Sequence, residues 1–277
     1  MSATLQFDVS GLPLRLEGVP GRLARDLATK WPAFEVPGPG ADPFLTVVVR
    51  AAAPREDPAP FTGKRTRSEV TGDAAIFRMD EGEARVPPSG AVEVDLVATT
   101  EGKQLYALIN LIMMAFAWRL PARGGLLLHA AGIVLDGRAF VLVGAEGAGK
   151  STWARLAAEA GATVLSDDVV LLDRAGGRVW ALSSPFRAPE LGALATGRWP
   201  VAALLGAHHA VVAALREESP MRTRARLAAN VPYAVDGLAQ YGALAQAIEG
   251  VLAEVPSRVL EFGRDGSFVG VLRGFRG

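Results

Sequence analysis

Residues 144–152 carry the clearest chemical signal in the chain. They match the phosphate-binding pattern G-x-x-x-x-G-K-[ST], with an apolar strand-like run before them and a helix-forming run after them. The glycines of this pattern let backbone N–H groups turn toward the anionic phosphates of a nucleotide. Lys150 is expected to act at the β- and γ-phosphates, and the Ser151 hydroxyl to bind Mg²⁺. The predicted nucleotide-binding residues are Gly144, Ala145, Glu146, Gly147, Ala148, Gly149, Lys150, Ser151 and Thr152.

Two adjacent carboxylates follow one helix later. The apolar run 162–166 ends in Asp167 and Asp168, and an acidic residue at the end of a strand behind a phosphate loop is placed for a second Mg²⁺ contact. Successive strand residues point to different sides, so one carboxylate can bind the metal while the other accepts a proton. A plain strand exit and turn is the alternative interpretation of the pair.

A loop with one arginine and a pair of adjacent histidines are further candidates by residue type. The segment 183–190 is predicted to be an irregular loop, and Arg187 is the only cation in it. Loops held by a rigid scaffold often present functional side chains. His208 and His209 match no motif, and we expect both to be exposed.

A hairpin is expected to position the phosphate loop. Segments 126–135 and 138–144 are strand-like and are joined by Asp136-Gly137, a signal for a tight two-residue turn. The strand that leads into the loop is therefore expected to pair antiparallel with the strand before it, whereas phosphate-loop enzymes usually enter through a parallel βαβ unit. A helix over residues 151–160 should follow the loop and end at Gly161.

The rest of the chain predicts a mixed α/β fold with two domains, 1–98 and 99–277. The first is predicted to be a small antiparallel sheet with one helix. Its expected elements are a hairpin over 5–16, a helix over 22–31 and strands at 44–50, 65–70, 75–79, 83–86 and 92–97. The second adds a buried apolar helix at 101–120, a hairpin over 169–182, a helix at 238–252 and strands at 258–262 and 267–272.

Composition limits the classes of partner. Lys and Arg together number 29, as do Asp and Glu, so a net charge of zero gives no global attraction to nucleic acid or an anionic membrane. The apolar run 105–118 is too short to cross a bilayer. Cysteine is absent and the first residues do not form a secretory signal, which is compatible with the cytoplasm.

In order and spacing, these residues resemble the C-terminal domain of the HPr serine kinase/phosphorylases and related kinases, which share a fold with the ATP-dependent phosphoenolpyruvate carboxykinases. The resemblance covers residues 126–190. It is carried by His129 before the hairpin into the phosphate loop, by Leu165-Ser-Asp167-Asp168 one helix later, and by Pro185-Phe-Arg187.

The resemblance implies roles for these residues. His129 and Asp167 would lie beside the transferred phosphoryl group, with Asp167 as general base toward a serine hydroxyl. Asp168 and Ser151 would bind the metal, and Arg187 would neutralise charge developing on the phosphate. A purely structural histidine between strands is the alternative for His129.

The resemblance predicts a Mg²⁺- and ATP-dependent kinase that acts on a hydroxyl, with a serine of a peptide or small protein as the favoured acceptor. Kinases similar to the lasso-peptide serine kinases of peptide-tailoring gene clusters fit the chain length and N-terminal sheet better than the bifunctional HPr enzymes do. An amino acid or sugar hydroxyl as acceptor, and a nucleotide sensor without transfer activity, are the alternatives. The HPr enzymes are oligomers, so a homo-oligomer is also open.

Overall fold

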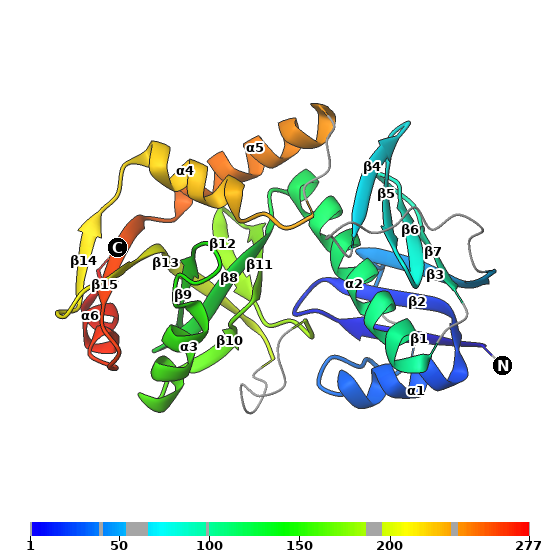
Figure 1. Ribbon diagram of the computed structural model, residues 1–277, viewed down its shortest axis with the longest axis horizontal. Helices are drawn as coiled ribbons and strands as arrows, with labels where there is room; N and C mark the ends of the chain where they lie inside the picture. The colour runs from blue at the N-terminus through cyan, green and yellow to red at the C-terminus, as the bar shows by residue number, and fades with distance from the viewer. Residues whose placement is uncertain are drawn as a thin grey trace. The chain divides into compact units, whose positions relative to one another are not determined.

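The computed structural model describes residues 2–38, 41–53, 66–97, 100–186, 196–233 and 238–276. Two compact units are present, Met1–Arg119 with Tyr233–Tyr241, and Leu120–Pro232 with Gly242–Gly277. The described residues form a mixed α/β structure with two mixed sheets and six α-helices (Figure 1).

The N-terminal unit is built on a seven-stranded sheet. In spatial order its strands are β1 (Ser2–Asp8), β2 (Pro13–Pro20), β3 (Leu45–Ala52), β7 (Val92–Val97), β6 (Gly82–Val86), β5 (Ala74–Met79) and β4 (Arg67–Thr71). The expected β1–β2 hairpin is confirmed. The prediction of a wholly antiparallel sheet is wrong, because β3 pairs parallel with both β2 and β7. Helix α1 (Gly21–Lys30) lies in the connection from β2 to β3, and such a crossover is what parallel neighbours require.

Helix α2 (Glu101–Arg119) belongs to this unit. It packs against α1 and against strands β3, β5, β6 and β7, and Leu108, Leu111 and Phe116 are fully buried. The unit therefore extends to Arg119, beyond the boundary expected at residue 98. The stretch 102–123, which includes the short 3-10 helix η1 (Leu120–Arg123), is long and apolar enough to span a membrane by length and composition alone, and 61% of its most apolar window is buried within the protein.

The second unit contains an eight-stranded sheet. Its strands are β8 (Leu126–Leu135), β9 (Arg138–Val143), β10 (Thr163–Ser166), β11 (Val169–Ala175), β12 (Arg178–Leu182), β13 (Arg198–His209), β14 (Ala214–Glu217) and β15 (Ser257–Phe262). The predicted hairpin is confirmed, since β8 and β9 pair antiparallel. Asp136 and Gly137 have φ angles of 51° and 74°, as a tight hairpin turn requires. On its other side β9 pairs parallel with β13, so the strand that leads into the phosphate loop lies between β8 and β13.

Helices cover both faces of this sheet. Alternate residues of β9 face opposite ways: Phe140 and Leu142 join a core with α3 (Lys150–Glu159) and α6 (Phe268–Gly274), whereas Val141 and Val143 join a core with α4 (Pro220–Ala229) and α5 (Leu238–Glu254). In Figure 1, α4 and α5 lie on one side of these strands and α3 on the other.

Two C-terminal elements differ from the sequence interpretation. The segment predicted as a strand at 267–272 is helix α6, in which Phe268, Val269 and Leu272 are buried at helical spacing. Helix α4 was not predicted, although Ser219 caps it by accepting a hydrogen bond from Arg222 N and Pro220 is its first residue.

Candidate functional site

The phosphate loop connects the end of β9 to the start of α3. Gly147 and Gly149 have φ angles of 80° and 88°, a left-handed conformation that glycine adopts without steric cost. Gly149 is the N-cap residue of α3 and provides no side-chain hydrogen bond to the helix. The N–H groups of the first turn therefore point toward the loop without a side-chain acceptor, which is the arrangement that binds anions.

Lys150 is held inside this loop. Its side chain is buried, and its Nζ donates hydrogen bonds to the carbonyl oxygens of Gly144 at 2.7 Å and Ala145 at 3.0 Å. Burial lowers the pKa of Lys150, and the negative charges of Asp168 and Glu146 oppose that shift. The lysine is thus close enough to the predicted carboxylate Asp168 for the two charges to interact.

His129 and Asp168 form a pair at the side of this loop. His129 lies on β8 and Asp168 in the connection from β10 to β11, and their Nδ1 and Oδ1 atoms are 2.9 Å apart. The backbone holds this arrangement, since Ala130 N donates to the carbonyl oxygen of Asp168 at 3.0 Å. Ser166, a buried residue, accepts hydrogen bonds at its Oγ from the backbone N–H groups of Asp168 and Val169. The turn that carries the carboxylates is therefore fixed from both sides.

Asp167 has a different environment from its neighbour. Its Oδ1 is buried and accepts no hydrogen bond within the described part of the chain, whereas the Asp168 side chain is 63% exposed. A buried carboxylate oxygen without a donor is costly, on the order of 1–3 kcal/mol or more. That cost is offset where a cation or a substrate hydroxyl meets the oxygen.

The oxygen atoms at this site suit Mg²⁺. Asp168 and the exposed Ser151 supply a carboxylate and a hydroxyl, which are hard ligands of the kind that Mg²⁺ prefers. No group of three or more His, Cys, Asp or Glu side chains is arranged to hold a metal among the described residues. Mg²⁺ in nucleotide sites commonly uses one or two protein oxygens together with phosphate oxygens and water, so the residues present fit such an ion.

The structure brings together most of the predicted site residues. The phosphate loop, Lys150, His129 and Asp168 are linked by the contacts above, and Asp167 is adjacent in sequence to Asp168. Arg187 lies outside the described residues. Ala145, Glu146 and Gly147 form the exposed part of the loop, and Thr152 is exposed in the first turn of α3.

His209 is a neighbour of the loop that sequence reasoning missed. It is exposed, as expected, but its Cε1 atom lies 3.4 Å from the position that a Cβ on Gly149 would take. The parallel pairing of β13 with β15 sets His209 opposite Phe262, and their ring centroids are 6.0 Å apart. No sequence motif marks this contact, since it depends on the pairing of strands that are far apart in the chain.

A partly buried ion pair behind the loop was also missed. Arg226 on α4 is paired with Glu218 and donates from Nη1 to the carbonyl oxygens of Leu205 at 2.8 Å and Val143 at 3.4 Å. Val143 is the last residue of β9, so this arginine is bonded to the strand end from which the phosphate loop leaves. The hydroxyl groups of Thr223 and Ser257 also donate hydrogen bonds to Glu218 Oε2.

The same helix α4 is linked to the histidine strand. Asn230, which follows α4, accepts a hydrogen bond at its carbonyl oxygen from His129 N at 2.7 Å, and its Nδ2 donates to Arg226 O at 2.8 Å. Helix α4 therefore contacts both the phosphate-loop strand and the strand that carries His129.

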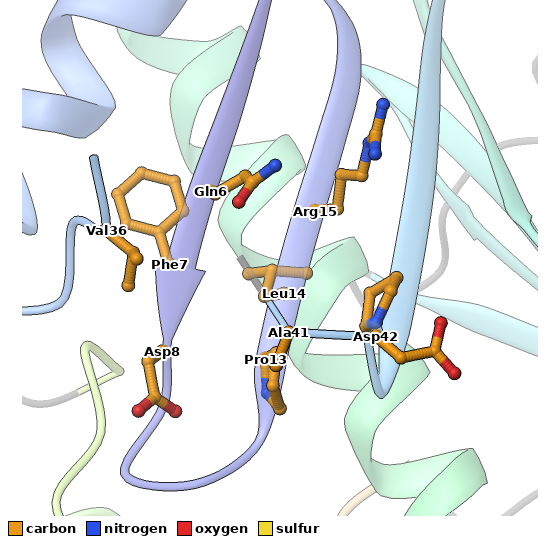
Figure 2. A pocket seen from close by; sticks show the side chains of 10 residues that line it. Gln6, Phe7, Asp8, Pro13, Leu14, Arg15, Val36, Ala41 and Asp42 are labelled. Atoms are coloured by element: carbon orange, nitrogen blue, oxygen red, sulfur yellow. The ribbon is translucent and has the colours of Figure 1, made fainter. Parts of the chain in front are cut away.

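A separate pocket of about 420 Å³ lies in the N-terminal unit (Figure 2). It is lined by the end of β1, the start of β2, Val36 and residues 41–43, and Figure 2 shows the carboxylates of Asp8 and Asp42 on opposite sides of Pro13. Asp8 is engaged in its own turn, since its Oδ1 accepts a hydrogen bond from Gly11 N at 2.6 Å. None of the predicted site residues lines this pocket.

Comparison of the sequence with protein-family models and with curated proteins finds no match. The chemistry of the site therefore has to be derived from its own geometry. That geometry places a buried lysine in a glycine-rich loop at the N-terminus of α3, with a carboxylate near enough to affect the lysine pKa and a histidine bonded to that carboxylate.

Proposed function

We propose that the chain is a Mg²⁺- and ATP-dependent kinase that transfers the γ-phosphoryl group to a hydroxyl, with a serine of a peptide or small protein as the favoured acceptor. The observation that carries this proposal is the grouping of Lys150, Asp168 and His129 around one phosphate loop. A loop that only binds anions needs the lysine, but phosphoryl transfer also needs carboxylates beside the transferred group.

Lys150 is the residue that meets the phosphates. Its hydrogen bonds to the carbonyl oxygens of Gly144 and Ala145 hold the ammonium within the loop, and phosphate oxygens replace these acceptors when a nucleotide binds. Because the ammonium is partly desolvated, its attraction to the phosphates is stronger than it would be in water. Ser151 and Asp168 would hold Mg²⁺, which when bound neutralises charge on the β- and γ-phosphates.

Asp167 is the general base in this proposal. Its Oδ1 is buried and accepts no hydrogen bond from the described residues, but the residue as a whole is only partly buried, and in this proposal its carboxylate takes the proton of an acceptor hydroxyl. The hydroxyl oxygen then forms a bond to the γ-phosphorus, the bond from that phosphorus to the bridging oxygen breaks, and ADP leaves. His129 has Nδ1 engaged by Asp168, and in its imidazolium form the ring donates a hydrogen bond from Nε2 to the transferred phosphoryl group.

The hairpin supports a relationship with the HPr-kinase-related enzymes. In the resemblance, the histidine precedes a hairpin into the phosphate loop. Here β8 and β9 pair antiparallel, and His129 lies directly before Ala130, the first residue of that pairing. We also propose that the second unit is a kinase core of the phosphoenolpyruvate carboxykinase type. The kinase would be of the kind that modifies peptides in peptide-tailoring gene clusters. The cytoplasm is the proposed location.

The test begins with nucleotide binding and proceeds to transfer. Calorimetry should show Mg²⁺-dependent binding of ATP, and incubation with serine-containing peptides encoded beside the gene should give a phosphopeptide whose site is mapped by mass spectrometry. Amino acids and sugars are screened in parallel as acceptors. Binding of Mg·ATP without transfer to any peptide, protein or metabolite of a cell extract would overturn the kinase and favour a nucleotide sensor, whereas absence of ATP binding would overturn both.

A further inference from the structure

The phosphate-loop strand has a different partner on each side. On one side β8 carries His129, and the connection that bears Asp167 and Asp168 pairs with the same strand. On the other side β13 ends at His209, whose ring lies against Gly149 of the loop. The two flanks of the loop therefore carry different chemistry, with carboxylates on the first and an imidazole followed by apolar residues on the second.

We propose that residues 209–212, the tip of the β13–β14 connection, form the nucleoside-binding edge of the site. This inference rests on the proposed function, in which the γ-phosphate lies beside His129 and Asp168. With the γ-phosphate on the β8 flank, we place the nucleoside on the opposite flank, where β13 ends. His209 then donates to the phosphates, and Val211 and Val212 cover the base.

The valines are suited to an apolar ligand surface. Val211 is 92% exposed and Val212 is 75% exposed, and they are neighbours in the chain. Consecutive Cα atoms are about 3.8 Å apart, so the Cα of Val211 lies within about 7.6 Å of that of His209. Two adjacent exposed apolar side chains near a phosphate loop provide a surface on which a planar base can pack. Such packing does not require specific hydrogen bonds to the base.

The tip is anchored rather than free. Ala210 N donates to the carbonyl oxygen of Phe262 at 3.0 Å, and the Ala210 carbonyl oxygen lies 3.1 Å from the position of a Cβ on Gly263. The His209 ring contacts Phe262, which contacts Phe268, and Phe268 stacks on Trp153 of α3. The imidazole is thus supported by aromatic side chains that reach the helix of the phosphate loop.

The experiment compares Mg·ATP with Mg·tripolyphosphate, which has the phosphates but no nucleoside. The double variant Val211→Ser, Val212→Ser should bind ATP about tenfold or more weakly, since each buried methylene contributes roughly a fourfold change in an equilibrium constant. Its affinity for tripolyphosphate should stay within about twofold of wild type, because serine leaves the loop unchanged. His208→Ala, an adjacent exposed histidine on the other face of β13, is the matched control and should bind both ligands as wild type does.

The His209 part of the proposal has its own variants. His209→Phe keeps a ring against Gly149 and Phe262 but removes the N–H donor, so it should weaken binding of both ATP and tripolyphosphate, and His209→Gln should restore part of the loss. If His209→Phe binds both ligands with wild-type affinity, His209 only packs against the loop, and its proposed role as a hydrogen-bond donor to the phosphates is overturned.

The outcomes separate this inference from the proposed function. If wild type binds neither ATP nor tripolyphosphate, the proposed function fails. If wild type binds ATP more tightly than tripolyphosphate and the valine variant keeps that difference, the nucleoside lies elsewhere and the inference is overturned while the kinase stands. Equal loss of affinity for both ligands in the valine variant would also overturn it, because the tip would then act on the loop and not on the nucleoside.

Discussion

The Nδ1 atom of His129 and the Oδ1 atom of Asp168 lie 2.9 Å apart, which couples the histidine to the second of the two adjacent carboxylates. The resemblance placed His129 next to Asp167 at the transferred phosphoryl group and gave Asp168 to the metal. The pairing observed here means that a change at Asp168 also releases the imidazole. Variants at these positions have to be interpreted together.

Asp168→Asn should chiefly weaken Mg²⁺-dependent binding of ATP. The substitution removes a charged metal ligand, while its cost to folding should be about 1 kcal/mol or less because the pair is largely exposed. Calorimetry with and without Mg²⁺ measures the effect, with Ser151→Ala expected to be milder. Unchanged Mg·ATP affinity in Asp168→Asn would show that the metal ligand lies elsewhere.

Asp167→Asn should separate chemistry from binding. Asparagine keeps the shape of the side chain but cannot accept the proton, and general-base assistance contributes about 10²- to 10⁴-fold in rate. Transfer to the acceptor should fall by that order while Mg·ATP affinity stays within a few fold, as measured by single-turnover kinetics and calorimetry. A variant that transfers at the wild-type rate would exclude Asp167 as the base.

Lys150→Ala should abolish nucleotide-dependent activity. A hydrogen bond to a charged group contributes roughly 1.5–3 kcal/mol, so ATP affinity should fall about 10- to 150-fold and the transfer rate further. Arg155→Ala is the control, since Arg155 is an exposed cation of the same helix and pairs with Glu159. Full turnover in Lys150→Ala, or an equal loss in the Arg155 control, would argue against the assignment.

Glu218→Gln should destabilise the protein at neutral pH. The change leaves the partly buried guanidinium of Arg226 without its charge partner, and an unsatisfied group of this kind costs roughly 1–3 kcal/mol. Urea unfolding at pH 7 measures the difference, with Glu249→Gln as the control because the Arg224–Glu249 pair links exposed side chains of α4 and α5. If the two substitutions lower the free energy of unfolding equally, the Glu218–Arg226 pair stabilises the protein no more than the exposed pair does.

The carboxyl group of Glu218 should also make the stability of the fold depend on pH. Burial by itself would raise the pKa of the Glu218 carboxyl, but hydrogen bonds from Arg226, Thr223 and Ser257 and the charge of Arg226 lower it below the ordinary value of 4.5. Because the folded-state pKa is the lower one, the carboxylate stabilises the fold above pH 4.5, and this contribution is lost as the pH falls through the folded-state pKa. Wild type should therefore lose stability below pH 4.5 more steeply than Glu218→Gln does.

Local features of the fold could be predicted from the sequence. The β8–β9 hairpin follows from Asp136-Gly137, a signal that lies within the turn itself, and the phosphate loop and its helix follow from a contiguous motif. The burial of α2 also followed from its apolar run. Each of these depends on residues that are neighbours in the chain.

Features that depend on distant pairing were not predictable. The parallel neighbours of β3 are set by which strands meet after a crossover, and alternation of apolar residues is the same in parallel and antiparallel strands. In α6, the run Phe268-Val-Gly-Val-Leu272 is too short to distinguish a helix from a strand, and its packing against the core decides for the helix. His209 reaches the loop because β13 pairs with both β9 and β15, and these strands lie far from β13 in the chain.

The hairpin that leads into the phosphate loop has a consequence for how the site forms during folding. His129, the loop, Lys150 and both carboxylates lie within residues 129–168. A two-residue turn joins β8 to β9, and β10, which follows helix α3, pairs with β8. The entropy lost on closing a chain segment grows with its length, and folding is faster when contacts are local. This part of the site can therefore assemble early, whereas Arg226 and His209 join it only when the C-terminal strands and α4 dock. The proposed nucleoside-binding edge should then be the last part of the site to become ordered.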